Sequence, residues 1–260
     1  MKCYINTDTY KEIALKTEDN LREICRKYSI EITDDIKDSD IIFSIGGDGT
    51  FLESARMAES KEIIGINCAT LGFLTEIRPQ DIEKTIKEIL DGNYHIEKRM
   101  MLEGEIIRKN GEKIKIPQAL NEISVSKNTF GVVRFDAIIN DKLINSYTAD
   151  GIIISTPTGS TAYNLSCGGP IVEPTAEIIT LTPIAPHTIL NRSIVLSDES
   201  VIKIRITELR GDTKAYALYD GNPIEVASDD IVKIRKSKNF TKIIKLNSQS
   251  FIDTIRENIS

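Results

Sequence analysis

The segment Gly46-Gly47-Asp48-Gly49-Thr50 has the composition of a phosphate-binding turn that carries a reactive carboxylate. Glycines let a backbone approach an anion closely, and the helix expected over residues 51–58 adds the positive end of its dipole. A carboxylate repels phosphate unless it holds a divalent cation or takes a proton from an attacking hydroxyl, so Asp48 indicates phosphoryl transfer. An ordinary turn would use the same residue types, and that alternative stays open.

Familiar nucleotide-binding motifs are absent from the sequence. It contains no G-x-x-x-x-G-K-[ST] phosphate loop, no G-x-G-x-x-G dinucleotide fingerprint and no H-R-D kinase loop. The glycine turn must therefore be interpreted from its own residues.

A second polar segment, residues 155–164, follows the apolar run 152–154. Five of its ten residues are Ser or Thr, and a Pro and a Gly prevent a regular element. Such a loop suits a ligand rich in hydroxyl and amide groups, and sugar and base recognition fits. It also suits a well-capped turn that leads into a helix. The pair Asn121-Glu122 offers an amide beside a carboxylate, which can bracket a ribose diol or occupy a surface loop.

The elements that position these residues differ between the two halves of the chain. Up to about residue 95, short apolar runs alternate with amphipathic helical patterns, which predicts a Rossmann-like parallel sheet with helices on its faces. The runs are 3–6, 30–32, 41–45 and 63–66, and the helical patterns are 21–28, 51–58 and 82–90. In such sheets, ligands bind at the carboxyl ends of strands, where residues 46–50 would lie.

After residue 96, short strands are joined by tight turns. Asn110-Gly111 and Asn140-Asp141 each separate two strand-like runs, as in hairpins. The remaining strand-like runs are 123–126, 152–155, 194–196, 201–206, 215–219, 231–235 and 243–246. This half predicts an antiparallel, sandwich-like all-β domain or a barrel-like sheet, and the apolar spacing after residue 250 predicts a last helix.

Composition limits the partners. The 260 residues suggest two domains, and 33 basic against 39 acidic residues give a net charge of −6 without a basic stripe, which argues against nucleic-acid binding. The four cysteines lack metal-ligand spacing and are expected in the core, and the two histidines make a histidine zinc site improbable. No apolar run reaches membrane-spanning length and no signal peptide is recognisable, so we expect a soluble, cytoplasmic protein with no membrane partner.

Taken together, these segments resemble the NAD kinases, which use ATP to phosphorylate the adenosine ribose of NAD and so produce NADP. The segments that carry the resemblance are 46–50, 65–67 with 71–74, 121–122, 148–174, 183–187, 191–192 and 219–221. They span almost the whole chain in the family's order. Lipid kinases and phosphofructokinases share the glycine-aspartate motif, whereas the Ser/Thr-rich stretch is much more specific.

The resemblance implies an architecture and a set of ligands. Residues 1–96 would form the α/β domain, joined by a C-terminal helix at 248–260, and residues 97–247 the β-rich NAD-binding domain, with the site between them. ATP would be the phosphate donor, NAD the substrate, and Mg²⁺ or another divalent metal the cofactor, with no metal ligand identified. A homodimer or homotetramer is usual in this family.

The resemblance also implies roles for single residues. Asp48 would be the general base near the ribose 2′-hydroxyl, Asn121 and Glu122 would hold the adenosine end of NAD, and Asp150 and Ala185 would lie near the nicotinamide riboside. The complete set implied at the ligands, besides Asp48, is Gly46, Gly47, Gly49, Thr50, Phe73, Asn121, Glu122, Asp150, Thr158, Thr161, Ala162, Tyr163, Ser166 and Ala185.

Two positions depart from the family's pattern. Ala69 stands where a glycine usually precedes Leu71, and Ser193 stands where a proline commonly follows Asn191-Arg192. The alternatives to an NAD kinase are a lipid or sugar kinase with the same glycine motif, or a dinucleotide sensor that never consumes ATP.

Overall fold

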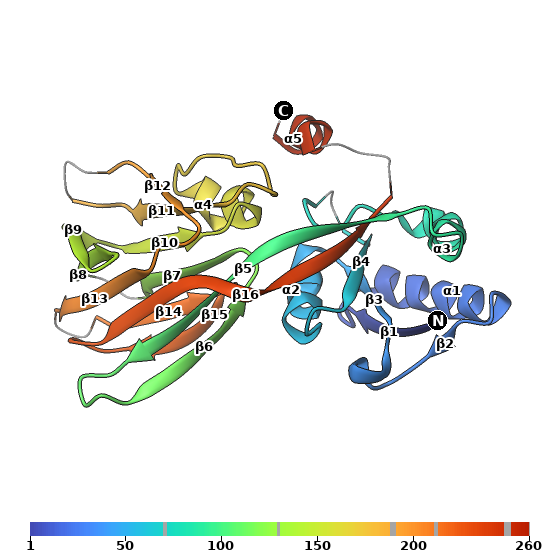
Figure 1. Ribbon diagram of the computed structural model, residues 1–260, viewed down its shortest axis with the longest axis horizontal. Coiled ribbons are helices and arrows are strands. Elements are labelled where there is room, and N and C mark those ends of the chain that lie inside the picture. The colour runs from blue at the N-terminus through green and yellow to red at the C-terminus, as the bar shows by residue number, and fades with distance from the viewer. Residues whose placement is uncertain (70–71, 129–130, 188–190, 211–212, 247–250, 260) are drawn as a thin grey trace. The chain divides into compact units, whose positions relative to one another are not determined.

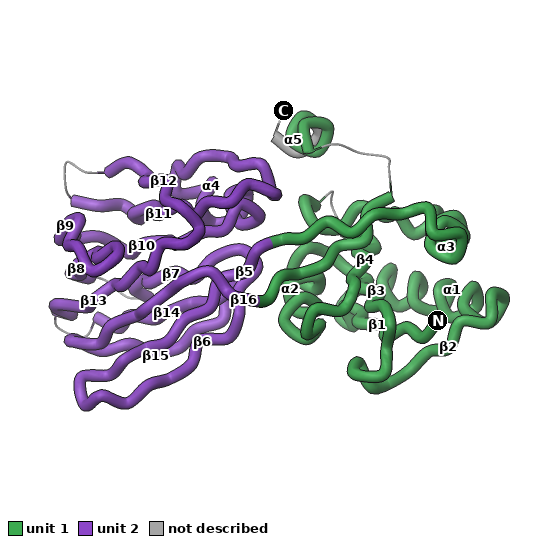
Figure 2. Tube along the Cα trace, in the orientation of Figure 1, with its two compact units in different colours: residues 1–99, 239–260 green, residues 100–238 purple. Residues whose placement is uncertain are grey.

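The computed structural model describes residues 1–69, 72–128, 131–187, 191–210, 213–246 and 251–259 (Figure 1). Residues 257–259 are described by their backbone alone. The chain divides into two compact units, residues 1–99 with 239–260 and residues 100–238 (Figure 2). Strands β5 (His95–Ile107) and β16 (Ile231–Lys245) each continue from one unit into the other. The domain limits expected from the sequence stay a prediction, because compactness does not test whether each part folds independently.

The first unit is built on a parallel sheet in the order β2-β1-β3-β4-β16. Its other strands are β1 (Lys2–Thr7), β2 (Glu31–Ile32), β3 (Ile41–Gly46) and β4 (Glu62–Asn67). Its helices are α1 (Glu12–Lys27), α2 (Asp48–Met57), α3 (Ile82–Leu90) and α5 (Phe251–Ile259), with short 3₁₀ turns at Ile36–Asp38 and Pro79–Asp81.

Helices cover both faces of this parallel sheet. Alternate residues of β3 and β4, among them Phe43 and Ile64, share a core with the apolar stripes of α1 and α3. Because successive side chains of a strand point to opposite faces, Gly65 faces the other side, where Phe51 of α2 packs against it. Every residue of β3 is buried, as expected of a central strand covered on both faces.

The second unit contains two antiparallel sheets. One has the order β12-β11-β10-β7-β14-β15, and in the other β16, β13, β8 and β9 pair in turn, with β5 and β6 alongside. The strands are β6 (Lys113–Ala119), β7 (Glu122–Lys127), β8 (Val133–Ile139), β9 (Lys142–Ala149), β10 (Gly151–Ser155), β11 (Ile178–Ile184), β12 (Ile194–Ser197), β13 (Ile202–Leu209), β14 (Ala215–Tyr219) and β15 (Asn222–Val226). A 3₁₀ turn at Thr158–Thr161 and the short helix α4 (Tyr163–Ser166) follow β10.

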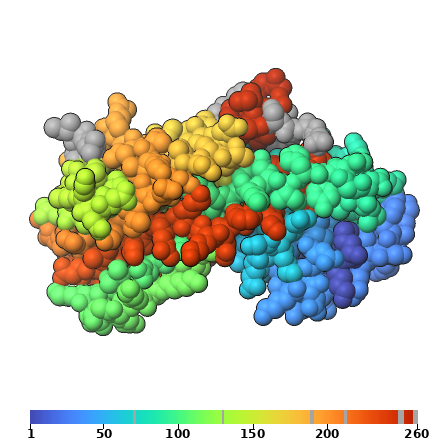
Figure 3. Space-filling model, viewed as in Figure 1, coloured from blue at the N-terminus to red at the C-terminus, as the bar shows by residue number. Residues whose placement is uncertain are grey.

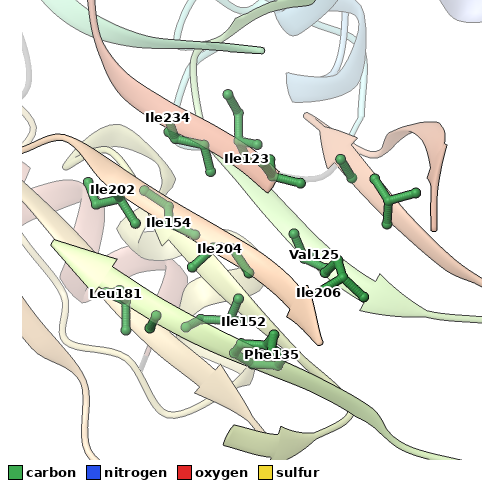
Figure 4. Close-up of a cluster of buried hydrophobic side chains, with 14 of the residues drawn as sticks. Ile123, Val125, Phe135, Ile152, Ile154, Leu181, Ile202, Ile204, Ile206 and Ile234 are labelled. Carbon is green, nitrogen blue, oxygen red and sulfur yellow. The ribbon is translucent and has the colours of Figure 1, made fainter. Parts of the chain in front are cut away.

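The two sheets of the second unit enclose one apolar core. Ile152 and Ile154 of β10 belong to one sheet, and Ile202, Ile204 and Ile206 of β13 belong to the other; all five are fully buried (Figure 4). Strand β5 pairs with β16, and the two run side by side on the face seen in Figure 3. Because alternate residues of β10 and of β13 are buried in the same core, each sheet turns one apolar face inward. This is the arrangement of a β sandwich.

The predicted fold class, an α/β domain followed by an all-β domain, is confirmed. Several details differ. Helix α1 begins at Glu12 rather than at residue 21, and α2 begins at Asp48 rather than Phe51. The runs 231–235 and 243–246 form one strand, and β11 and β15 were not expected. Of the predicted C-terminal helix, residues 248–250 and 260 lie outside the described part of the chain, as does Leu71 of the family motif. Within the described residues, no helix is long and apolar enough to span a membrane.

Candidate active site

The glycine turn lies at the carboxyl edge of the parallel sheet. Strands β1, β3 and β4 all end there, and backbone bonds from Asp8 N to Ile45 O (2.9 Å) and from Cys68 N to Gly46 O (2.7 Å) tie the neighbouring loops to the end of β3. Gly47 is the extended N-cap of α2, so Asp48 occupies the first helical turn. A negative side chain is favoured there by the helix dipole.

The Asp48 carboxylate binds the backbone of a loop that follows β4. Its Oδ2 accepts a hydrogen bond from Phe73 N at 2.9 Å, and its Oδ1 accepts from Leu74 N at 3.1 Å and from Thr75 Oγ1 at 3.3 Å. A carboxylate offers about four lone-pair positions, so Oδ2 keeps room for a further donor. Phe73, one of the predicted ligand residues, is thereby fixed beside Asp48.

Two glycines are required by close approach in this part of the site. A Cβ on Gly72 would collide with Asp48 Oδ1, and a Cβ on Gly46 would collide with Thr50 Oγ1. Gly49, in contrast, faces open space. The backbone of the turn is therefore accessible at Gly49 and tightly packed at Gly46.

A pocket of about 480 Å³ adjoins the turn. It is lined by Gly47, Gly49 and Thr50 of the glycine motif, by Glu53, and by residues 6–11, which form the end of β1 and the loop before α1. Lys11 is the one cationic residue in this lining, and its Nζ lies 3.9 Å from the position of a Cβ on Gly47. Lys11 also pairs with Asp8 at 3.1 Å. The pocket thus combines backbone N–H groups, hydroxyls and one ammonium with the carboxylates of Asp8 and Glu53. An anion would therefore bind at the N-terminus of α2 and not across the whole lining.

In the second unit, the Asp220 carboxylate organises the residues around Asn121 and Glu122. It accepts hydrogen bonds from the backbone N–H groups of Leu120 (2.9 Å), Asn121 (2.8 Å) and Glu122 (3.3 Å). Asp220 sits in the β14–β15 turn at φ 44°, a conformation that Asp tolerates. Through these bonds the carboxylate holds a segment that lies 99 residues away at Asn121.

Glu122 is the most strongly perturbed carboxyl of this unit. Its side chain is 8% exposed, and its Oε2 has no hydrogen-bond partner among the described residues. Burial, followed by the charge of Asp220, raises the pKa of Glu122 to about 8. A buried acceptor without a donor costs free energy, and a ligand with hydroxyl groups would relieve that cost.

The hydroxyl-rich loop shows the structural use expected from the sequence, and its use in ligand recognition stays a prediction. Thr156 serves the backbone, since its Oγ1 donates to Leu120 O at 2.6 Å and accepts from Gly159 N at 3.0 Å. A Cβ on Gly159 would collide with the carbonyl of Asn121, so the loop packs directly on the Asn121 segment.

Buried Asn164 holds the far side of this loop. Its Nδ2 donates to the carbonyls of Ser160 and Pro170, each at 3.2 Å, and its Oδ1 accepts from Thr182 Oγ1 at 2.7 Å. Ser193, where the family commonly has proline, shares a 2.8 Å hydrogen bond with Thr182 Oγ1. The hydrogen bond between Asn164 and Thr182 therefore connects the loop to β11.

The remaining predicted ligand residues of this unit lie around the same loop. Tyr163 is 43% exposed, and its pKa is raised by burial first and then by Cys167, Asp150 and Glu122, so these groups are within electrostatic reach of one another. Asp150 pairs with Lys127 at 2.7 Å, and Asp150 N bonds to Ile184 O, beside exposed Ala185 at φ 43°. Thr158, which is buried, and Thr161, Ala162 and exposed Ser166 complete the loop.

The structure therefore groups the predicted site residues into two sets. The first contains Gly46, Gly47, Asp48, Gly49, Thr50 and Phe73, and the second contains Asn121, Glu122, Asp150, Thr158, Thr161, Ala162, Tyr163, Ser166 and Ala185. Sequence reasoning missed the supporting roles of Thr75, Asn164 and Asp220. Asn164 and Asp220 belong to segments that carry the family resemblance, whereas Thr75 lies just after one.

Comparison with known proteins identifies the chain. Residues 4–94 match the ATP-NAD kinase N-terminal domain, and residues 120–246 match the ATP-NAD kinase C-terminal domain. The chain is 41% identical over 226 residues to the NAD kinase of Caldanaerobacter subterraneus subsp. tengcongensis, covering 85% of this chain and 79% of that protein. This chain belongs to the ATP-NAD kinase family. The predicted family is thus confirmed.

Solved structures of this family have the same fold. The structure of yeast NADH kinase complexed with NADH superposes with a TM-score of 0.91 at 22% identity, over 100% of this chain and 87% of that one. An NAD kinase from Archaeoglobus fulgidus in complex with ATP superposes with a TM-score of 0.82 at 25% identity, over 99% of both chains.

The raised pKa of Glu122 makes stability depend on pH in a defined direction. Between its ordinary value of 4.5 and about 8, the folded chain binds a proton that the unfolded chain releases, so folding loses stability as the pH rises through that window. We expect Glu122→Gln to melt roughly 5 °C above the unsubstituted protein at pH 9, with the difference disappearing near pH 4. Melting curves measured from pH 4 to 9 check this. Identical curves for both proteins at every pH would contradict it.

The Asp220 carboxylate predicts a second stability effect. Asp220→Asn leaves one acceptor oxygen for three backbone N–H groups, so the free energy of unfolding should fall by about 2 kcal/mol in urea titrations. Asp229→Asn is the matched control, because Asp229 pairs with Lys109 at a largely exposed position and should change stability by less than about 0.5 kcal/mol. Equal effects of the two substitutions would refute the role given to Asp220.

Proposed function

We propose that this chain is an NAD kinase that transfers the γ-phosphoryl group of ATP to the 2′-hydroxyl of the adenosine ribose of NAD. The observation that carries the proposal is the Asp48 carboxylate, held by three hydrogen bonds inside a glycine turn at the start of α2. The choice of ATP and NAD as substrates rests on the family description, ATP-NAD kinase, and on relatives named NAD kinase. ATP and NAD are accordingly the predicted small-molecule partners.

The donor nucleotide fits the pocket beside the glycine turn. The backbone at Gly47 and Gly49, the N-terminus of α2 and the Lys11 ammonium offer positive potential to a triphosphate. Within the described residues, no three His, Cys, Asp or Glu side chains are grouped closely enough to hold a metal ion. We infer that ATP binds together with Mg²⁺ or another divalent metal, which would neutralise phosphate charge.

The acceptor fits the residues around Glu122. Its Oε2 is buried without a partner among the described residues. A ribose diol carries hydroxyl groups that both donate and accept, so it can bind the carboxyl in either protonation state. Asn121 beside it adds an amide, and the exposed ring of Tyr163 can stack on a base. Asp150 and Ala185, with Thr158, Thr161, Ala162 and Ser166, complete the proposed dinucleotide contacts.

Positioning is the main task of such an enzyme, because phosphoryl transfer has a loose transition state with little covalent work for the protein. Asp48 Oδ1 already accepts two hydrogen bonds and Oδ2 accepts one, so we assign Oδ2 as the acceptor of the 2′-hydroxyl proton. The hydroxyl oxygen attacks the γ-phosphorus, the bond to the β-γ bridging oxygen breaks, ADP leaves, and the proton passes to Asp48.

A coupled assay separates this proposal from its alternatives. Purified protein is mixed with NAD, ATP and Mg²⁺, and NADP is detected with glucose-6-phosphate dehydrogenase. NADP formation supports the proposal. Good NAD binding without product would favour a dinucleotide sensor, and transfer to diacylglycerol or fructose phosphate would favour the rival kinases. We also infer a homodimer or homotetramer in the cytoplasm, which light scattering and cell fractionation would check.

Substitution of Asp48 tests its chemical role. Asp48→Asn keeps the size of the side chain but removes the base, so turnover should fall roughly a hundredfold or more, while the NAD dissociation constant stays within about threefold. Calorimetric titration with NAD provides the binding measurement. Near-normal turnover in this variant would remove Asp48 from the mechanism.

Substitution of Lys11 tests the donor pocket. Lys11→Met removes the ammonium of the pocket, so KM for ATP should rise roughly tenfold while KM for NAD changes little, because one charge-assisted contact to phosphate is lost. Lys16→Met is the control, because Lys16 lies on exposed α1 surface and pairs with Glu12. A Lys11 variant with an unchanged KM for ATP would place the triphosphate elsewhere.

A further inference from the structure

We propose that Thr75 is a positioning residue that acts through Asp48, by occupying Oδ1 and so leaving Oδ2 to meet the acceptor hydroxyl. The inference rests on the proposed function, because it concerns the residue that we assign as the base. It adds to the family motif a residue 27 positions away from Asp48 in the sequence.

The contacts of Thr75 fix its hydroxyl on one carboxylate oxygen. Thr75 is fully buried, and its Oγ1 donates to Asp48 Oδ1 at 3.3 Å. Its backbone carbonyl accepts from Asn67 Nδ2 at 3.2 Å, which ties it to the end of β4. A β-branched side chain has few χ1 states, so a buried threonine held at its backbone directs its hydroxyl firmly.

The space for Thr75 is provided by glycine. A Cβ on Gly65 would lie 2.8 Å from Thr75 Cγ2 and 3.0 Å from its Cα, so any larger residue there would displace Thr75. Gly72 is needed for a similar reason, because a Cβ there would collide with Asp48 Oδ1. The absence of a side chain at Gly65 and at Gly72 therefore lets the loop stay within hydrogen-bond distance of the Asp48 carboxylate.

The consequence is a difference between the two carboxylate oxygens. Leu74 N and Thr75 Oγ1 both bind Oδ1, whereas Phe73 N alone among the described residues binds Oδ2. Loss of the Thr75 hydroxyl would leave one donor on each oxygen. The carboxylate would then no longer present one preferred oxygen, and small errors of placement lower rates steeply in reactions that depend on alignment.

A double-mutant cycle tests this role. Thr75→Val, which replaces the hydroxyl with a methyl group, should lower kcat roughly tenfold and leave KM for NAD and ATP within about twofold. Thr75→Ser should restore most of kcat, because the hydroxyl returns. In the Asp48→Asn background, Thr75→Val should have no further effect on kcat, since it acts through the carboxylate that is already lost.

Thr241→Val is the matched control. Thr241 is a buried threonine of the same unit, and its hydroxyl has no hydrogen-bond partner among the described residues, so its loss should leave kcat unchanged. If Asp48→Asn is impaired but Thr75→Val is fully active, or lowers kcat equally in both backgrounds, the role of Thr75 is overturned while the proposed function stands. If the unsubstituted protein makes no NADP, or Asp48→Asn turns over normally, the proposed function fails together with it.

Discussion

The structure around the Asp48 carboxylate depends on one interaction, the binding of this side chain by the loop that follows β4. Two backbone N–H groups and one hydroxyl converge on this side chain. They satisfy donors of an otherwise irregular segment and fix the carboxylate at the first turn of α2, where the dipole of that helix favours its charge. One set of hydrogen bonds thus serves folding and the alignment of the proposed base.

The second unit uses the same device with different residues. Asp220 binds three consecutive backbone N–H groups and so orients Asn121 and Glu122. Its charge also contributes, after burial, to the raised pKa of Glu122. The Glu122 carboxyl is buried with its Oε2 lacking a partner among the described residues, which lowers the stability of the folded chain. A ligand that forms a hydrogen bond with this oxygen would remove that cost. In both units, a carboxylate in a turn accepts hydrogen bonds from the backbone of a predicted ligand residue. That residue is Phe73 in the first unit and Glu122 in the second.

The sequence predicted those features that depend on local pattern. Short apolar runs predicted the strands at 152–155 and 215–219, and both are confirmed. The glycine turn at 46–50 made Asp48 a candidate base, a role that stays a prediction. The supporting contacts could not be predicted, because Thr75 reaches Asp48 across 27 residues and Asp220 reaches Asn121 across 99. Strand β15 was missed because Pro223 argues against a strand, yet β15 is the edge strand of its sheet, where proline is tolerated.

The most direct measurement of the central interaction is a comparison of the amide protons of Phe73 and Leu74 in the intact protein and in an Asp48→Ala sample by NMR. A hydrogen bond to a carboxylate shifts an amide proton downfield and slows its exchange with deuterium, so both signals should move upfield and exchange faster when the side chain of Asp48 is removed. Equal chemical shifts and equal exchange rates in the two samples would contradict the account.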